Sequence, residues 1–174
     1  MAVVFPHDQL SIMDYNRVVK DLNGNTKEEF LERIKSVCSV EIWNEGAFRP
    51  DRKHTIGMYL DKQWYKLKLL PDTYCEDDPV SQLDVSVLQK NILTPILNIG
   101  DPRTDKRIEF IGGIRGLVEL ERLVDGGMAV AFAMYPTSLD ELMEIADTGN
   151  IMPPKSTWFE PKLRSGIFLH KLSE

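Results

Sequence analysis

The sequence predicts an α+β fold in which a mixed β-sheet is flanked by helices, with a β-α-β-α-β order in the C-terminal half. Two capping boxes open segments whose apolar residues recur at helical spacing. Two β-rich runs flank a short polar turn at residues 61–63, which predicts a hairpin. Residues 129–134 are apolar without alternation, which is typical of a central strand buried on both faces.

In the N-terminal half, residues 2–5 form an apolar run that predicts a buried strand, and residues 9–22 are interpreted as extended. A turn at residues 23–25 follows. Thr26 and Glu29 make the first capping box, which predicts a helix. The positions of this helix expected to face the core are Phe30, Ile34 and Val37.

Three further strands are predicted at residues 40–43, 55–60 and 64–70, the last two paired as the hairpin. Asp84 is expected to cap a helix that ends at Pro95, because proline interrupts helical hydrogen bonds.

In the C-terminal half, strands are expected at residues 107–111, 128–135 and 166–172, and helices at residues 114–124 and 139–146. The second of these helices has the clearer boundaries. Ser138 and Glu141 make its capping box, and Gly149 is placed to end it. Its inward stripe is expected to be Leu139, Leu142, Met143 and Ala146.

The 174 residues carry 21 basic and 27 acidic side chains, a formal net charge of −6. A chain of this length supports one hydrophobic core, so residues 1–174 are predicted to be a single domain. No run of 18 apolar residues is present, so no membrane contact is expected. Cys38 and Cys75 are too few for a disulfide framework, which predicts a cytoplasmic location. No metal site is expected, because His7, His54 and His170 lie far apart.

The first unusual segment is the glycine corner, residues 112–116, between a predicted strand and a predicted helix. The helix opens with Gly112 and Gly113 and carries Arg115 in its first turn, where the helix dipole disfavours a cation. Backbone N–H groups at a helix start, together with an arginine, can bind a phosphate or a carboxylate. In the alternative, the glycines serve a tight turn and Arg115 pairs with Glu119.

The second is the proline loop, residues 152–166, in which three prolines and the absence of alternation predict an ordered loop without regular structure. Residues 150–170 carry three basic side chains against Glu160, a formal charge of +2 that leaves −8 for the remainder. In the alternative, the loop packs Trp158 and Phe159 over the sheet and its lysines are solvated. The side chains suited to anionic oxygens are Lys155, Ser156, Thr157, Lys162, Arg164 and Ser165.

The third is residues 101–107, where charges of both signs alternate beside a turn. Arg103 and Arg107 are candidate forked donors to a polar ligand, with Asp105 orienting one of them. A solvated turn with compensating charges is the equal alternative. Residues 14–17, Asp-Tyr-Asn-Arg, carry a similar but weaker signal.

Five segments of the chain resemble the C-terminal portion of domain-of-unknown-function family 1015. These segments are residues 5–10, 14–19, 101–105, 112–116 and 152–162. Family members are longer, and their N-terminal part carries an Asp-Gly-His-His-Arg motif similar to that of ParB and sulfiredoxin-like nucleotide hydrolases and of free-serine kinases. That motif is absent from this sequence. The resemblance therefore implies a C-terminal fragment of a bacterial protein, and it implies a small phosphorylated or amino-acid ligand.

We predict that the glycine corner and the proline loop converge on an anionic small molecule, a phosphate or an amino acid. A missing N-terminal domain would supply the acid or base, so the sequence leaves open whether this chain is an enzyme and which cofactor it uses. One alternative is a docking or dimerisation module, in which Trp158 and Phe159 anchor the chain on that domain or on a second copy. A nucleic-acid-associated regulator is disfavoured by the net charge of −6.

Overall fold

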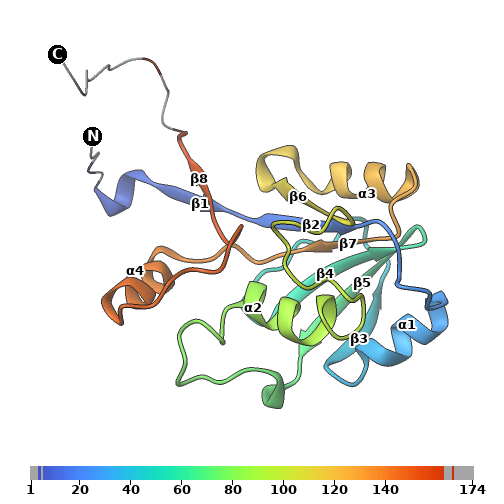
Figure 1. Cartoon of the computed structure of the whole chain (residues 1–174). Coiled ribbons are helices and arrows are strands. Elements are labelled where there is room, and N and C mark those ends of the chain that lie inside the picture. Colours follow the sequence, from blue (N-terminus) through green and yellow to red (C-terminus); the bar gives the residue numbers. More distant parts are fainter. Residues whose placement is uncertain (1–3, 5, 163–165, 167–174) are drawn as a thin grey trace.

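A computed structural model describes residues 4, 6–162 and 166 of the chain. Its main feature is a six-stranded sheet in the order β3-β5-β4-β7-β2-β6, beside which β1 and β8 form a separate two-stranded ribbon (Figure 1). The α+β class is confirmed. We expected a mixed sheet, and the strand pairs among the described residues are all antiparallel. The strands are β1 (Ser11–Met13), β2 (Tyr15–Val19), β3 (Cys38–Trp43), β4 (Thr55–Leu60), β5 (Gln63–Leu69), β6 (Ile108–Gly112), β7 (Val130–Ala133) and β8 (Trp158–Glu160).

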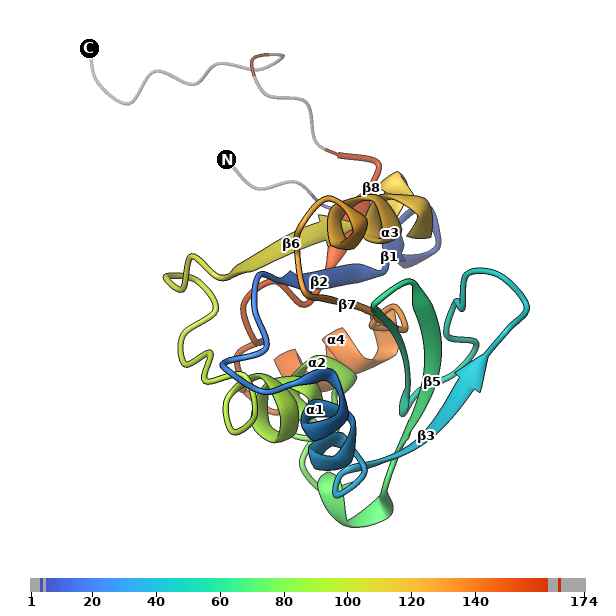
Figure 2. The same ribbon diagram turned by 90° about the vertical axis from the view of Figure 1, so that its right-hand side faces the viewer.

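Helices cover both faces of the large sheet (Figure 2). Helices α1 (Lys27–Ile34) and α2 (Asp84–Leu88) pack on one face, where the larger hydrophobic cluster lies. Helix α3 (Leu117–Asp125) packs on the other face against a smaller cluster. Helix α4 (Leu139–Asp147) lies toward the end of the molecule that carries the β1-β8 ribbon.

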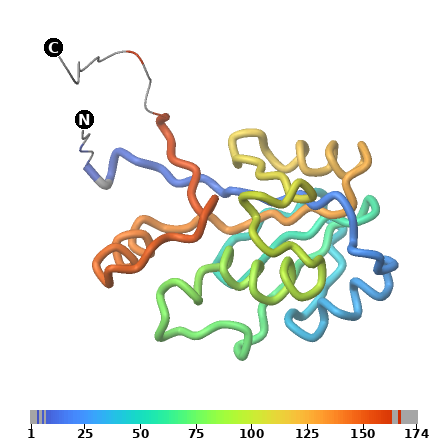
Figure 3. The backbone as a smooth tube through the Cα atoms, viewed as in Figure 1, coloured from blue at the N-terminus to red at the C-terminus, as the bar shows by residue number. Residues whose placement is uncertain are grey.

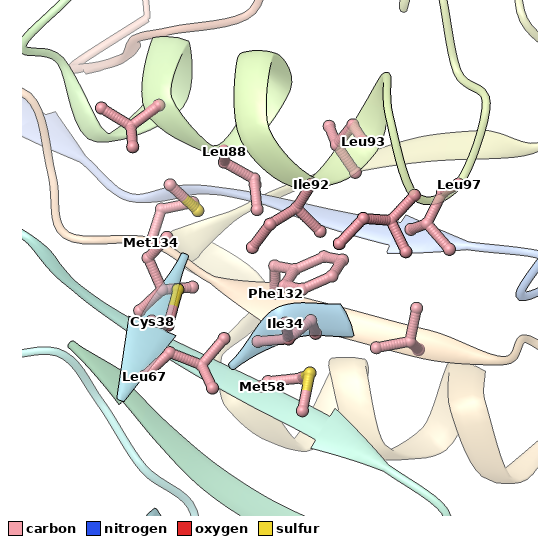
Figure 4. Packing of buried hydrophobic residues seen from close by; sticks show 14 of the residues in the cluster. Ile34, Cys38, Met58, Leu67, Leu88, Ile92, Leu93, Leu97, Phe132 and Met134 are labelled. Atoms are coloured by element: carbon pink, nitrogen blue, oxygen red, sulfur yellow. The ribbon is translucent and has the colours of Figure 1, made fainter. Parts of the chain in front are cut away.

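The larger cluster forms around Phe132 of β7, which is fully buried. Leu88 of α2 and Ile92 approach this ring from the helical layer, and Met58 of β4 lies on the sheet (Figure 4). Phe132 occupies the middle of the run 129–134, so the prediction of a central strand there is confirmed.

The short-range predictions are confirmed where they rest on capping and turn chemistry. Both capping boxes form, and they open α1 and α4. The hairpin joins β4 to β5 through Asp61 and Lys62, which both have positive φ. Gly149 follows the end of α4 with a φ of 72°, as expected of a helix-terminating glycine.

Three predictions about helices are wrong. Asp84 does not cap α2, because the N-cap residue is Leu83 and the Asp84 carboxylate accepts the backbone N–H of His54 instead. The helix predicted at 114–124 is interrupted at Gly116, so that only α3 is α-helical. The inward stripe of α4 was also misplaced, since Glu141 and Ile145 are its buried residues while Met143 and Ala146 are exposed.

Two predicted strands differ from the structure. Within residues 2–5 the structure describes only Val4, which is exposed and not in a strand. The strand predicted at 166–172 lies outside the described residues except for Gly166. The third strand of the β-α-β-α-β order is β8, which lies inside the proline loop where no strand was expected. The tube in Figure 3 shows the two distant segments β1 and β8 running side by side.

Candidate functional site

The glycine corner is a tight turn that packs directly on β2 and on the proline loop. Strand β6 ends at Gly112, a 3-10 turn spans Gly113–Arg115, and Gly116 has a φ of 72° before α3 begins. A Cβ on Gly113 would overlap the Asp14 carboxylate, and one on Gly112 would lie 2.5 Å from the Trp158 ring. The two glycines are therefore required by close packing.

The proline loop lies against the glycine corner, which is the juxtaposition that the sequence hypothesis needed. Strand β8 pairs with β1, opposing Trp158 to Met13. The Trp158 ring packs on Gly112, and its centroid is 5.4 Å from that of Tyr15 in an edge-to-face arrangement. The contact links the end of β6, the start of β2 and the loop.

Two lysines of the loop lie over these aromatic rings. The Nζ atom of Lys155 is 5.9 Å from the centroid of Tyr15, and that of Lys162 is 4.2 Å from the centroid of Trp158. Both lysines are exposed. Within the described part of the chain, neither ammonium group has a carboxylate within 4.0 Å.

Two of the other predicted site residues, Arg115 and Ser156, have partners within the corner and the loop. Arg115 lies 3.6 Å from Glu119, as the alternative interpretation expected, although its side chain is largely exposed. The Ser156 hydroxyl is engaged because it donates to the backbone oxygen of Pro153. Thr157 is half-buried next to it, and Arg164 lies outside the described residues.

Arg103 and Arg107 serve the turn in which they stand. Arg103 binds Asp101 at 2.9 Å, and Arg107 binds Asp105 at 2.9 Å. These hydrogen bonds lower the pKa of both aspartates. Arg107 also donates to the backbone oxygens of residues 97 and 98, which closes the preceding loop. Both guanidinium groups therefore have carboxylate partners within their own segment.

Sequence reasoning missed a buried polar network around β2. Asp14 and Asn16 are almost fully buried, and the Asn16 amide donates to Asp14 Oδ2 at 2.6 Å. Arg49 donates to Asp14 Oδ1 at 3.0 Å, and the backbone N–H of Met134 donates to Asn16 Oδ1 at 2.9 Å. The signal was the polar segment 14–17 inside an extended stretch. Its residues are functional candidates because buried polar groups need specific partners.

Arg17 is the most unusual member of this segment. It is 3% exposed, and burial lowers its pKa to about 10 because the charged form loses its hydration. Its Nη2 donates to the backbone oxygen of Lys155 at 2.9 Å and its Nη1 donates to that of Tyr15. The guanidinium group also lies 5.5 Å from the centroid of the Phe110 ring. Arg17 thus holds the proline loop on β2.

A second buried cluster joins β4, α2 and α4. His54 donates its backbone N–H to both oxygens of Asp84, at 2.9 and 3.1 Å. Its Nδ1 lies 3.2 Å from Asp84 Oδ1 but makes no aligned hydrogen bond. Lys53 pairs with Glu141 at 2.8 Å. In the described residues, no group of three His, Cys, Asp or Glu side chains is arranged to hold a metal ion.

The structure thus shows an α+β fold whose corner and loop form a cationic and aromatic surface. Residues 1–86 match the family model described as protein of unknown function (DUF1015), which confirms the resemblance found in the sequence. No match was found among curated proteins. No helix of the described residues is long and apolar enough to span a membrane.

The fold is shared with a solved structure. A free serine kinase in complex with AMP aligns with a TM-score of 0.50 and 15% identity, over 87% of this chain and 54% of that one. A conserved hypothetical protein from Pyrococcus furiosus aligns with a TM-score of 0.48 and 14% identity, over 87% of this chain and 56% of that one. The chain therefore spans about half the length of these structures.

Proposed function

We propose that the chain forms one wall of a binding site for an anionic small molecule bearing a phosphate or an amino-acid carboxylate. The observation that supports this most is the pair Lys155 and Lys162, which lie over aromatic rings without a carboxylate partner among the described residues. An ammonium group held on a ring face keeps donors available for an oxyanion. The exposed Arg115 adds a third cation beside the start of α3.

The start of α3 favours the same kind of ligand. The N-cap residue of α3 is Gly116, which provides no side-chain cap, so the first N–H groups of the helix are available to an acceptor. An anion placed there also interacts favourably with the helix dipole. We assign Gly112 and Gly113 a supporting role, because they allow the loop and β2 to approach this point.

A second part of a longer protein completes the site in this proposal. The free serine kinase structure that shares the fold is about twice as long as the region aligned with this chain, so a protein of that length has room for a further domain. The wall described above carries cations but no paired acid and base, and that domain would supply them. We also propose a cytoplasmic protein, a location supported by two cysteines that form no disulfide.

A docking module is the second candidate, and exposed apolar side chains at the corner favour it. Ile114 and Val118 are 60% and 71% exposed and stand four residues apart. The anchor expected from the sequence, Trp158, is instead half-buried against Gly112 and Tyr15. In this alternative, a double variant with Ile114→Ser and Val118→Ser should no longer form a complex with the remaining domain. Its ligand binding should be unchanged.

Titration calorimetry with phosphoserine, AMP, serine and inorganic phosphate tests the ligand proposal on this chain and on the full-length protein. We expect binding of at least one phosphorylated probe, weakened at least tenfold by Lys155→Gln with Lys162→Gln. The matched control is Lys68→Gln, which removes an exposed charge from β5. Equal affinity in the double variant, or no binding to either protein, contradicts the proposal.

A further inference from the structure

A cavity of about 250 Å³ lies beneath the proline loop, between the sheet and α2. It is distinct from the lysine-bearing surface because different side chains line it. Strands β2 and β6 provide Arg17 and Phe110, while Ser86 and Lys90 come from α2 and from the π-helix Gln89–Leu93 that follows it. Pro102 and Pro153 close it from two loops. Its volume is just below the roughly 300–1,000 Å³ of drug-sized ligand sites, which indicates a small occupant.

Arg17 is the only strongly buried charge in this wall. Among the described residues no carboxylate lies within 4.0 Å of its guanidinium group. Its recorded acceptors are two backbone oxygens, whereas a guanidinium group has five N–H donors. Buried charges in proteins are normally paired, so this one lacks the partner that an anion would provide.

Ser86 provides an independent observation at the same cavity. Its hydroxyl oxygen is buried and has no hydrogen-bond partner among the residues that the structure describes. An unpartnered buried hydroxyl is destabilising unless another group satisfies it. Because Ser86 and Arg17 both line the cavity, each is a donor for an oxyanion bound there.

The rest of the wall restricts the ligand further. Phe110, Pro102 and Pro153 are apolar, so the ligand body that contacts them should be apolar too. Lys90 adds a second cation. No acidic side chain is among the described residues that line the cavity, so nothing there would pair with an ammonium group.

We propose that this cavity binds a small organic anion, with one carboxylate or phosphate group on Arg17 and Ser86 and an apolar body without an ammonium group. This site is separate from the surface that carries Lys155 and Lys162, and different substitutions test the two sites.

Matched probes test the charge and the body of the ligand. Calorimetry on the full chain compares 3-methylbutanoate with 3-methylbutanamide, which lacks the charge, and with valine, which adds an ammonium group. The ester 3-methylbutyl phosphate tests whether a phosphate group can replace the carboxylate, and inorganic phosphate tests whether the apolar body is needed. We expect the carboxylate or the phosphate ester to bind, and the amide and valine to bind at least tenfold more weakly. The Arg17 Nε–H resonance in a ¹H–¹⁵N spectrum should shift on binding.

Variants show whether binding occurs in the cavity. Ser86→Ala removes one oxygen and should weaken binding about tenfold, and Arg17→Met should abolish it. Because Arg17 also holds the loop, Ser86→Ala and Lys90→Gln decide the question if Arg17→Met does not fold. Lys68→Gln is the charge-matched control and should bind as the wild type does. Binding of no anion, equal binding of valine, or full affinity in folded Ser86→Ala and Lys90→Gln overturns the proposal.

Discussion

Asp84 should make the stability of this protein decrease as pH rises through the weakly acidic range. The residue is only 9% exposed, and burial raises its pKa to about 7. The backbone N–H of His54 opposes this shift by donating to the carboxylate, and the nearby Glu141 adds to it. In the folded protein Asp84 is therefore protonated at a pH where the unfolded chain has already released the proton.

The sign and size of the effect follow from linkage. Between pH 3.8 and about 7 the folded state holds a proton that the unfolded state does not, so the free energy of unfolding falls with pH. At about 1.36 kcal/mol for each pH unit, this interval corresponds to about 4 kcal/mol. Above pH 7 both states are ionised and the contribution is constant. Asp84→Asn removes this term and keeps an oxygen for the His54 N–H.

Urea denaturation of both proteins from pH 4 to pH 8 measures the difference. We expect Asp84→Asn to gain up to about 4 kcal/mol relative to the wild type across this range. His54, whose pKa burial lowers, is present in both proteins and largely cancels. Asp61→Asn is the control: the hydrogen bond from Lys27 lowers the Asp61 pKa below 3.8, so this carboxylate is already ionised in both states over most of the range and the difference should be nearly flat. A flat or falling difference for Asp84→Asn would refute the reasoning.

Two further predictions concern packing at the glycine corner. Gly113→Ala should destabilise the protein by about 2 kcal/mol in urea denaturation, since the new methyl group overlaps the Asp14 carboxylate, while Gly100→Ala meets no atom within 4 Å and should be near neutral. Trp158→Ala should lower the free energy of unfolding by roughly 2 kcal/mol and speed proteolysis within the proline loop, because the ring packs on Tyr15. Trp158→Phe, which keeps an aromatic ring there, should retain most of that stability, and equal losses would contradict the packing argument.

The elements that could be predicted from sequence are those encoded within a few residues. In the first capping box, Glu29 accepts the N–H of Thr26 at 2.8 Å and the Thr26 hydroxyl accepts that of Glu29 at 3.2 Å. These bonds span three residues, so the local sequence contains all the information they need. The hairpin between β4 and β5 is predictable for the same reason.

The inward face of α4 could not be predicted because its neighbours decide it. Leu142 and Met143 were expected inside on apolar character, but the protein buries Glu141 and Ile145. Glu141 is buried because Lys53, 88 residues earlier in the chain, pairs with it at 2.8 Å. The capping bond that Glu141 accepts from the Ser138 N–H at 2.7 Å is local, but the pairing with Lys53 is not, so no local pattern shows that this carboxylate is buried.

Strand β8 was missed because it depends on a distant partner. It is three residues long, shows no alternation, and is flanked by prolines. It becomes a strand by pairing with β1, which lies about 145 residues earlier. The excess of positive charge in the loop, by contrast, is a property of composition and depends on no distant partner.

The polar residues of β2 show why the cavity could not be predicted from the sequence, whereas the exposure of Lys155 and Lys162 could. A lysine in a loop signals a solvent-exposed cation wherever the loop lies, so Lys155 was a candidate from the start. The role of Arg17 at the cavity could not be predicted from its neighbours in the sequence. Its burial, its hydrogen bond to the backbone oxygen of Lys155 and the nearby Ser86 hydroxyl depend on three separate segments of the chain. Since Arg17 both holds the loop and lines the cavity, its replacement disturbs two properties at once. Ser86 has no partner to lose, so its replacement by alanine separates ligand binding from the support of the loop.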